Sequence, residues 1–399
     1  MTAEAVFCAA LFGKDFIMKR NIYLLCGIAF LQGMVFYAPV AALYRQAQGI
    51  TLFQITQIES ISLALCILLE VPWGFAAERI GYRKTMIICC SLYFVSKIIF
   101  WQAENYGMFL LERILLSIVT AGMSGVDAGM LYVSCDAHDA QRIFGFYHGA
   151  GMAGLFAAAV LFAVFIQEDY ALAAFLTVVS YAAAMLLSFF LCEVKEQKEE
   201  NASISDLFRE VRTMFHSRRL LALLLGAALL GEAHQSITVF LNQVSYVQVG
   251  LDDRSIGLIY IVSASLGIFA LLSSFVSRHL GPCKTMLATA LLAALACIVL
   301  SFSVSALTAV GSVFVLRMVH GIFQPLQMEL QNKEIKTDNR AAMLSAAALF
   351  MEGAAIMTNL CFGWLSQVAL SASYMFGAAI CMSAFILFAV YFILHGKNA

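Results

Sequence analysis

The chain has 399 residues, of which 62% are hydrophobic and 12% are charged, and its formal net charge is -1 at pH 7. Soluble domains carry about 25% charged residues, so this chain cannot cover a water-facing surface and lipid must be its main solvent. The near-zero net charge argues against a nucleic-acid partner. The eleven cysteines include no CxxC pair, which argues against a thiolate metal site.

The first 18 residues hold an apolar patch that is too short to span a bilayer, and we treat residues 1–18 as an N-terminal extension. Twelve apolar runs follow, each near the length of about 20 residues that a membrane helix needs. Runs of this length satisfy their backbone in lipid as helices, so the sequence predicts an all-α membrane protein with twelve transmembrane helices. The runs lie near 22–44, 53–76, 85–102, 107–132, 144–166, 170–192, 220–246, 256–277, 285–303, 306–328, 342–367 and 371–394.

A charged segment at 193–218 divides the spans six and six. The expected organisation is a first six-helix bundle at 19–192, a cytoplasmic linker at 193–218 and a second bundle at 219–399. With a cytoplasmic N-terminus, 19 of the lysines and arginines fall on the cytoplasmic side and 2 fall in outer loops. This asymmetry predicts that both termini are cytoplasmic.

Several landmarks recur about 200 residues apart. The stretch GFAAERIGYRKTM at 74–86 has an echo in SRHLGPCKTM at 277–286, and Gly49 and Gly250 each precede a span. Arg113 and Arg317, 204 residues apart, lie in the fourth and tenth spans. The repetition predicts two pseudo-symmetric six-helix bundles related by an axis along the membrane normal.

The first of these stretches resembles the loop between helices two and three of the major facilitator superfamily, although that family usually has Asp at the position of Glu78. Leu111-Glu112-Arg113, followed by Ser124-Gly125 and Asp127, is similar to a fourth-helix pattern of many bacterial members. The resemblance implies a transporter of the bacterial plasma membrane that works by alternating access. It also implies that the loop clamps the cytoplasmic helix ends in the outward-facing state, through Gly74, Glu78, Arg79, Gly81, Arg83 and Lys84.

The chemistry of these residues agrees with a gating role, because their charges can pair with each other or bind helix C-termini when two helix ends meet. The alternative is that the cations are ordinary positive-inside anchors.

Charged groups inside membrane spans are costly and are functional candidates by default. Asp127 is fourteen residues beyond Arg113, about 21 Å along one helix, so each needs a partner on another helix. Glu70 precedes Pro72 in a Glu-x-Pro pattern that the resemblance associates with drug exporters; alternatively it is a structural partner near Arg113 or Asp127. Lys97 lies close to the outer end of its span and is expected to snorkel.

The seventh span is the most polar. Glu232, Gln235, Asn242 and Gln243 fall on one face of an ideal helix, which suits the wall of a water-filled cavity or a contact with another polar helix. His234 and Glu232 are candidates for proton exchange near neutral pH. Further candidates for solute binding or coupling lie on the first, tenth and eleventh spans: Gln32, Tyr37, His320, Gln324, Glu352 and Asn359.

The fifth span carries Gly145, Gly149, Gly151 and Gly154, whose spacing predicts close helix packing. Antiporting drug exporters of the family often have a Gly-Pro pair in this helix, and the corresponding HGAGMAGLFAAA has no proline. This departure argues against proton antiport.

No nucleotide-binding, hydrolase or metalloprotease motif is present, so we expect no enzymatic activity and no cofactor. The leading hypothesis is a monomeric secondary transporter for proton-coupled efflux of a drug-like or amphipathic compound. One alternative is uptake of a polar nutrient such as a sugar or an organic anion. The other is a non-transporting membrane sensor that has kept the fold.

Overall fold

The computed structural model describes residues 14–123, 126–135, 140–194, 217–335 and 340–396, and every regular element within these ranges is helical. Twelve helical segments are long and apolar enough to cross a membrane. The prediction of an all-α protein with twelve membrane spans is therefore confirmed. The expected extension at 1–18 and the linker at 193–218 lie mostly outside the described residues.

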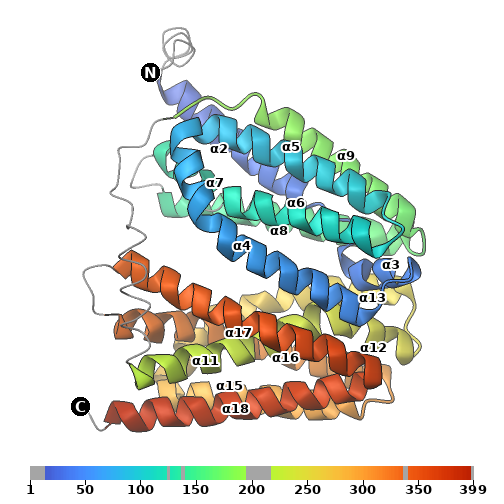
Figure 1. Cartoon of the computed structure of the whole chain (residues 1–399), viewed down its shortest axis with the longest axis vertical. Helices are drawn as coiled ribbons and strands as arrows, with labels where there is room; N and C mark the ends of the chain where they lie inside the picture. Colours follow the sequence, from blue (N-terminus) through green and yellow to red (C-terminus); the bar gives the residue numbers. More distant parts are fainter. Residues whose placement is uncertain (1–13, 124–125, 136–139, 195–216, 336–339, 397–399) are drawn as a thin grey trace. The chain divides into compact units, whose positions relative to one another are not determined.

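The chain forms two compact units, residues 1–44 with 61–199 and residues 45–60 with 200–399. The helices α3 and α4 contribute residues to both units (Figure 1). The helices up to the end of the first unit are α2 (Lys14–Gly33), η1 (Ala38–Val40), α3 (Ala41–Ala47), α4 (Leu52–Ile80), α5 (Tyr82–Trp101), α6 (Tyr106–Met123), α7 (Val126–Val133), α8 (Ala140–Leu161), the π-helix η2 (Phe162–Ile166) and α9 (Tyr170–Ser188).

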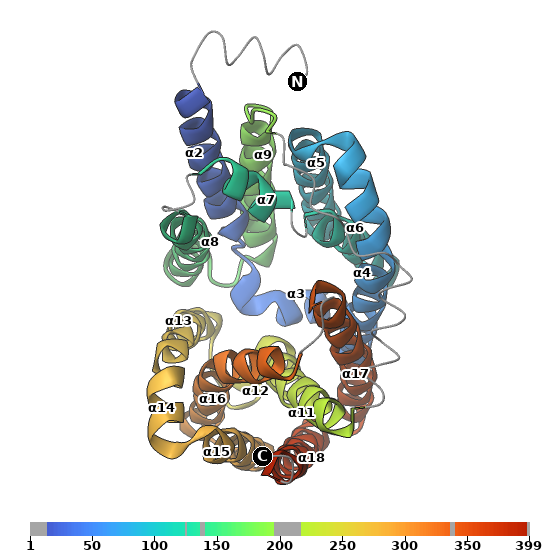
Figure 2. The same cartoon turned by 90° about the vertical axis from the view of Figure 1, so that its left-hand side faces the viewer.

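The second unit continues with helices that Figure 2 shows nearly end-on. They are α11 (Arg218–Gln235), the π-helix η3 (Ser236–Leu241), α12 (Asn242–Gln248), α13 (Asp253–Ser265), the 3-10 helix η4 (Leu266–Leu272), α14 (Ser273–Leu280), α15 (Pro282–Ser301), α16 (Ala306–Glu334), α17 (Arg340–Val368) and α18 (Leu370–Gly396).

The two units repeat with an offset of 200 residues. The starts of α5, α6, α8 and α9 each precede the starts of α15, α16, α17 and α18 by this number. Two turns also repeat in detail, because Gly81 and Gly281 have φ of 91° and 81°, a region that favours glycine. In this register Arg317 corresponds to Ser117, so the pairing of Arg317 with Arg113 expected from the sequence is shifted by one helical turn.

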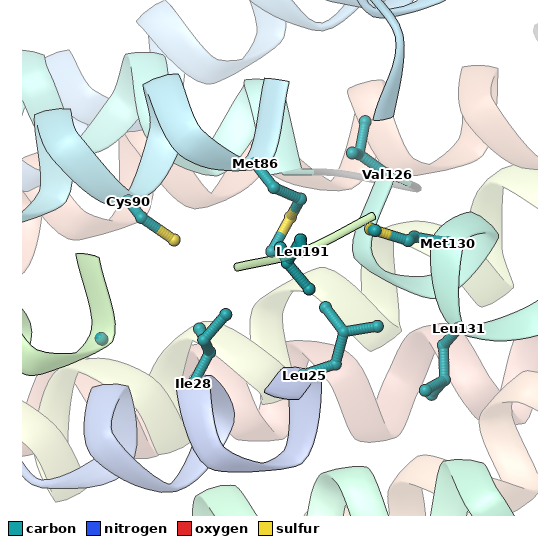
Figure 3. Packing of buried hydrophobic residues seen from close by; sticks show 9 residues of the cluster. Leu25, Ile28, Met86, Cys90, Val126, Met130, Leu131 and Leu191 are labelled. Carbon is teal, nitrogen blue, oxygen red and sulfur yellow. The ribbon is translucent and has the colours of Figure 1, made fainter. Parts of the chain in front are cut away.

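A hydrophobic cluster between the second half of α2 and the first half of α5 holds the first unit together. Figure 3 shows Leu25 and Ile28 of α2 facing Met86 and Cys90 of α5, with Leu191 between them. All five side chains are almost completely buried. Burial of these apolar groups against each other stabilises the contact between the two helices.

The contact between α2 and α8 depends on glycine. A Cβ atom added at Gly33 would lie 2.1 Å from the carbonyl oxygen of Gly151, and one added at Gly154 would lie 2.0 Å from that of Phe30. The expected close packing is thus confirmed for Gly151 and Gly154. It is wrong for Gly145 and Gly149, where an added Cβ would meet nothing within 4 Å.

The opening span of each unit is irregular at the same place. In the first unit α2 ends at Gly33, and a non-helical stretch leads into η1. Two hundred residues later the π-helix η3 interrupts the seventh span. Irregular backbone at membrane depth persists where protein groups satisfy its freed carbonyl and amide groups, and π-helical turns occur often at functional sites.

Side chains of α9 supply those partners in the first unit. The Thr177 hydroxyl accepts a hydrogen bond from the Phe36 amide at 3.0 Å. The Tyr181 hydroxyl donates to the Gln32 carbonyl at 2.7 Å. The break in the first span is therefore a defined feature of the fold.

Candidate functional site

A polar cluster lies beside the π-helix of the second unit. The imidazole rings of His234 on α11 and His320 on α16 are stacked, with centroids 3.8 Å apart and planes inclined by 6°. His234 Nε2 lies 3.3 Å from the hydroxyl of Thr238 on η3, and Arg317 Nη2 donates to the carbonyl of the same threonine at 3.1 Å. The irregular turn and the two helices thus bring together residues that are up to 86 positions apart.

Two nitrogen atoms of this cluster keep unused hydrogen-bonding capacity. His320 Nδ1 and Arg317 Nε are buried and have no hydrogen-bond partner among the residues that the structure describes. A buried polar atom without a partner costs free energy, and in a native protein it calls for an explanation such as a ligand. We refer to His234, Thr238, Arg317 and His320 as the histidine cluster.

A second polar group lies next to the histidine cluster in sequence. The Ser236 hydroxyl donates to Glu232 Oε1 at 2.8 Å and lies 3.5 Å from Oδ1 of Asn359 on α17. All three residues are buried. Two of the predicted site residues from separate spans, Glu232 and Asn359, are therefore bridged by one hydroxyl.

The predicted polar face of the seventh span is only partly present. Glu232, Asn242 and Gln243 are buried, whereas Gln235 is exposed. Glu232 and Gln235 both lie on α11 before η3 begins, three residues apart, so the difference in their burial depends on which neighbouring helices cover each position. On the other spans Gln324 is exposed and Glu352 is half-buried.

The first unit contains a buried cation, Lys97, whose position differs from the predicted one. Lys97 does not snorkel; it is 5% exposed, and its Nζ donates to the hydroxyl of Tyr37 at 3.0 Å. Glu112 Oε1 lies 3.7 Å away in an ion pair. The ring centroids of Tyr37, Tyr93 and Tyr181 lie 5.3 to 5.7 Å from the ammonium, a distance that allows cation–π attraction. We call these five residues the lysine cage.

Lys97 and Glu112 are charged groups inside spans and therefore functional candidates by default, but sequence reasoning did not assign them to a site, and it missed Tyr93 and Tyr181. A usable signal was present, because Tyr93 and Lys97 are four residues apart on one helix face and a lysine inside a span needs a partner. The positions of Tyr37 and Tyr181 relative to Lys97 depend on how different spans pack together, and a local sequence pattern does not predict that packing.

The remaining predicted residues of the first unit lie apart from this cage or at its edge. Gln32 donates to the Cys90 thiol at 3.5 Å, and Arg113 is half-buried next to Glu112 in the chain. Asp127 is half-buried and accepts a hydrogen bond from the Tyr147 hydroxyl at 2.9 Å. Glu70 is exposed, and the described residues form no hydrogen bond or ion pair with it, so the expectation of a structural partner near Arg113 or Asp127 is wrong.

The predicted gating loop contacts the end of α9. Arg83 Nη2 donates to the Phe189 carbonyl at 3.3 Å, so a cation caps the C-terminal end of a helix. The Arg83 amide donates to Glu193 Oε1 at 3.4 Å, and Lys84 is exposed. Gly74, Glu78 and Arg79 lie in the last turns of α4, and their side chains are outside the described part of the chain.

Burial raises the pKa of Glu193. The hydrogen bond from the Arg83 amide and the charges of Arg83 and Lys84 oppose that shift.

Among the described residues, no group of three or more His, Cys, Asp or Glu side chains has the arrangement of a metal site.

Two six-helix bundles with opening spans that are broken beside buried polar groups form an architecture typical of membrane transporters. Residues 23–358 match the family model described as Major Facilitator Superfamily, and the chain therefore belongs to that family. This confirms the resemblance drawn from the loop after the second span.

Solved structures of the same fold have low sequence identity to the chain. A variant of the nucleoside transporter NupG is 14% identical with a TM-score of 0.81, covering 93% of this chain and 100% of that one. A D-xylose–proton symporter is 13% identical with a TM-score of 0.71, covering 93% and 97%. A bacterial homolog of the human lysosomal transporter Spinster is 14% identical with a TM-score of 0.70, covering 95% and 96%. No curated protein sequence matches the chain.

Proposed function

We propose that the chain transports a small polar organic solute by alternating access, as a monomer with both termini in the cytoplasm of a bacterial cell. The observation that carries this proposal is the histidine cluster, in which two buried nitrogen atoms have no partner among the described residues. Arg317 and His320 suit a solute that carries carbonyl, hydroxyl or carboxylate oxygens.

The neutral polar side chains near the cluster extend the same chemistry. Asn242 and Gln243 are buried on α12, and Asn359 is buried beside Ser236. Amide side chains both donate and accept, which matches the hydroxyl groups of sugars and nucleosides. The nucleoside and D-xylose transporters that share the fold handle solutes of this kind, which supports the proposal.

A second candidate is proton-coupled efflux of an amphipathic compound. The observation that favours it is the exposed Glu70 in its Glu-x-Pro pattern, together with the buried Glu232. In this case protons would be the coupling ion and the two carboxylates would be candidate carriers. The direction of flux and the chemistry of the transported solute distinguish this candidate from transport of a polar solute.

A thermal-shift screen of the purified chain tests the polar-solute proposal. The panel contains nucleosides, pentoses, small carboxylates, dipeptides and a cationic amphiphile such as ethidium, each at about pH 5.5 and 7.5. We expect a polar compound to raise Tm by several degrees, since saturation at 100 times Kd adds about 2.7 kcal/mol to the free energy of unfolding. Arg317→Gln and His320→Gln should abolish the shift.

Matched controls come from α14, where Arg278 and His279 are exposed. Arg278→Gln and His279→Gln should keep the full shift. The polar-solute proposal fails if ethidium alone stabilises the protein, or if the α16 variants respond to the polar compound as the controls do. Flux of the stabilising compound into or out of proteoliposomes then gives the direction of transport.

A further inference from the structure

A cavity of about 890 Å³ lies between the N-terminal parts of α2 and α8, and its volume is within the range of small-molecule sites. The two helices lie side by side in the first unit (Figure 2). They come closest where Gly33 of α2 meets Gly151 of α8, and the lining residues of α2 all precede that contact. The cavity therefore extends from this contact towards the N-terminal ends of both helices.

Two cations lie at the N-terminal end of the cavity. Lys19 on α2 and Arg142 on α8 each precede the other lining residues of their helix, and both are exposed. The Arg142 guanidinium lies over the ring of Phe146, 5.5 Å from its centroid, which gives it a defined place beside the cavity. The described lining residues include no carboxylate, and no described carboxylate forms an ion pair with either cation. Two positive charges thus meet the cavity at one end, and an anion would complement them.

The wall beyond the cations is mainly apolar. On α8, Phe146, Gly149 and Ala153 continue the face that begins with Arg142, at spacings of three and four residues. From Arg142 to Ala153 the helix rises about 16 Å, at 1.5 Å per residue. This length is about half of the 30 Å hydrocarbon core of a bilayer, which is the depth of one leaflet. The wall therefore matches an elongated molecule that has an anionic head and an apolar tail.

The second unit has no such open wall at the corresponding place. At the 200-residue offset Tyr23, which is 75% exposed beside the cavity, corresponds to Leu223, which is completely buried. Lys19 corresponds to Arg219, which forms an ion pair with Glu334. The fold is thus complete without an exposed cationic space here, so the cavity is a particular feature of the first unit.

We propose that this cavity binds an anionic phospholipid of the cytoplasmic leaflet, with its phosphate at Lys19 and Arg142 and an acyl chain along the α8 face that ends at Ala153. Lysine and arginine bind phosphate oxygens through charge-assisted hydrogen bonds. Basic pockets between membrane helices on the cytoplasmic side suit such headgroups, and the distribution of Lys and Arg predicts that this end of α2 is cytoplasmic. The proposal does not depend on which solute the chain transports.

Native mass spectrometry of the full chain in detergent tests the proposal. The protein is mixed with equal amounts of dioleoyl phosphatidylglycerol and dioleoyl phosphatidylcholine, which share their acyl chains and differ in headgroup charge. We expect the anionic lipid to bind roughly tenfold more tightly, since each Lys or Arg near a membrane surface adds to the attraction. Lys19→Gln combined with Arg142→Gln should abolish this preference.

The matched control combines Arg278→Gln with Lys284→Gln, which removes two exposed cations of the second unit and should keep the preference. Gly149→Leu tests the apolar wall while both cations remain. It introduces the residue that the second unit has at position 349, and a Cβ atom at Gly149 meets nothing within 4 Å. We expect this variant to bind the anionic lipid several-fold more weakly, because the larger side chain fills part of the cavity.

Cys26 gives a second readout that needs no substitution. Its thiol lines the cavity and is half-buried, whereas the half-buried Cys283 at the start of α15 lies outside it. Alkylation of Cys26 by N-ethylmaleimide should be several-fold slower in nanodiscs of phosphatidylglycerol than in nanodiscs of phosphatidylcholine, because the bound lipid covers the thiol. The rate at Cys283 should be the same in both.

Equal binding of the two lipids overturns the proposal, as does a Lys19 and Arg142 double variant that behaves like its control. Undiminished binding by Gly149→Leu, or equal alkylation of Cys26 in the two kinds of nanodisc, overturns the placement of the lipid in this cavity. Glycerol 3-phosphate that displaces the lipid at a similar concentration identifies a site for a free phosphate compound and overturns the proposal as well. If the double variant fails to fold, Gly149→Leu and the alkylation of Cys26 decide the outcome.

Discussion

Glu193 follows the end of α9 and shows how one side chain ties the gating loop to a helix end. Its carboxylate accepts a hydrogen bond from the Arg83 amide, and a Cβ atom added at Gly81 would lie 3.0 Å from its Oε2. Glycine is therefore favoured at position 81 for two reasons: the backbone has a positive φ of 91°, and the carboxylate of Glu193 approaches closely.

Stability should depend on pH through Glu193, because burial raises the pKa of this carboxyl group in the folded protein. The neutral form is then favoured by folding. The contribution of Glu193 to the free energy of unfolding is fully present below the pKa of the unfolded state, about 4.3. It is lost as pH rises through the higher pKa of the folded state. We expect the Tm of the unmodified chain to fall relative to that of Glu193→Gln as pH rises from about 4 to 7.

Thermal unfolding in detergent at a series of pH values measures this difference. Glu168→Gln, which changes an exposed loop carboxylate, is the control and should show a constant offset. A Tm difference for Glu193→Gln that stays constant, or that has the opposite slope, contradicts the assignment.

At the scale of elements, α2 and α8 make the closest backbone contact described in the first unit. Gly33, Gly151 and Gly154 allow it, whereas Gly145 and Gly149 on the same helix border open space. Gly149 is only two residues from Gly151, about 200° around the helix, so the glycines differ because they lie on different faces of α8 and only one face meets α2.

Alanine substitutions separate the two groups. Gly154→Ala should lower the free energy of unfolding by about 1–3 kcal/mol, because its methyl group would overlap the Phe30 carbonyl. Gly149→Ala should be neutral or stabilising by about 0.5–1 kcal/mol, since alanine is the better helix former and meets no neighbour. Denaturant or thermal unfolding of the two variants gives the comparison, and equal stabilities would contradict the role assigned to Gly154.

For the whole molecule, the 200-residue offset makes the second unit an internal control for the first. Both units keep the positive-φ turn, at Gly81 and Gly281, and the irregular opening span, while the buried polar groups differ: a lysine cage in one and a histidine cluster in the other. Shared features therefore belong to the fold, and features that differ are candidates for solute binding and coupling.

The distribution of Lys and Arg predicts which loops face the cytoplasm. A cysteine introduced at Glu104, in a loop predicted to face the outside, should react with a membrane-impermeant maleimide on intact cells. A cysteine introduced at Arg278 should react only after permeabilisation, although both positions are exposed. Background labelling of the native thiols is measured in the unmodified chain, and the reverse pattern of labelling would contradict cytoplasmic termini.

The sequence by itself determined the class of fold. Apolar runs of membrane length have one solution in lipid, since helices satisfy their own backbone, so twelve runs predicted twelve spans. The repeated glycines and charges predicted the duplication. Glycine recurs at corresponding turns because a turn with positive φ favours glycine wherever it occurs.

Tertiary structure decided which polar residues meet. Lys97 has an apolar run on either side and looks like a snorkelling lysine, yet its partners come from η1, α6 and α9. Gln235 is likewise exposed although it lies only three residues from the buried Glu232 on the same α-helix. Both outcomes depend on contacts between spans distant in sequence, and helix periodicity contains no information about those contacts.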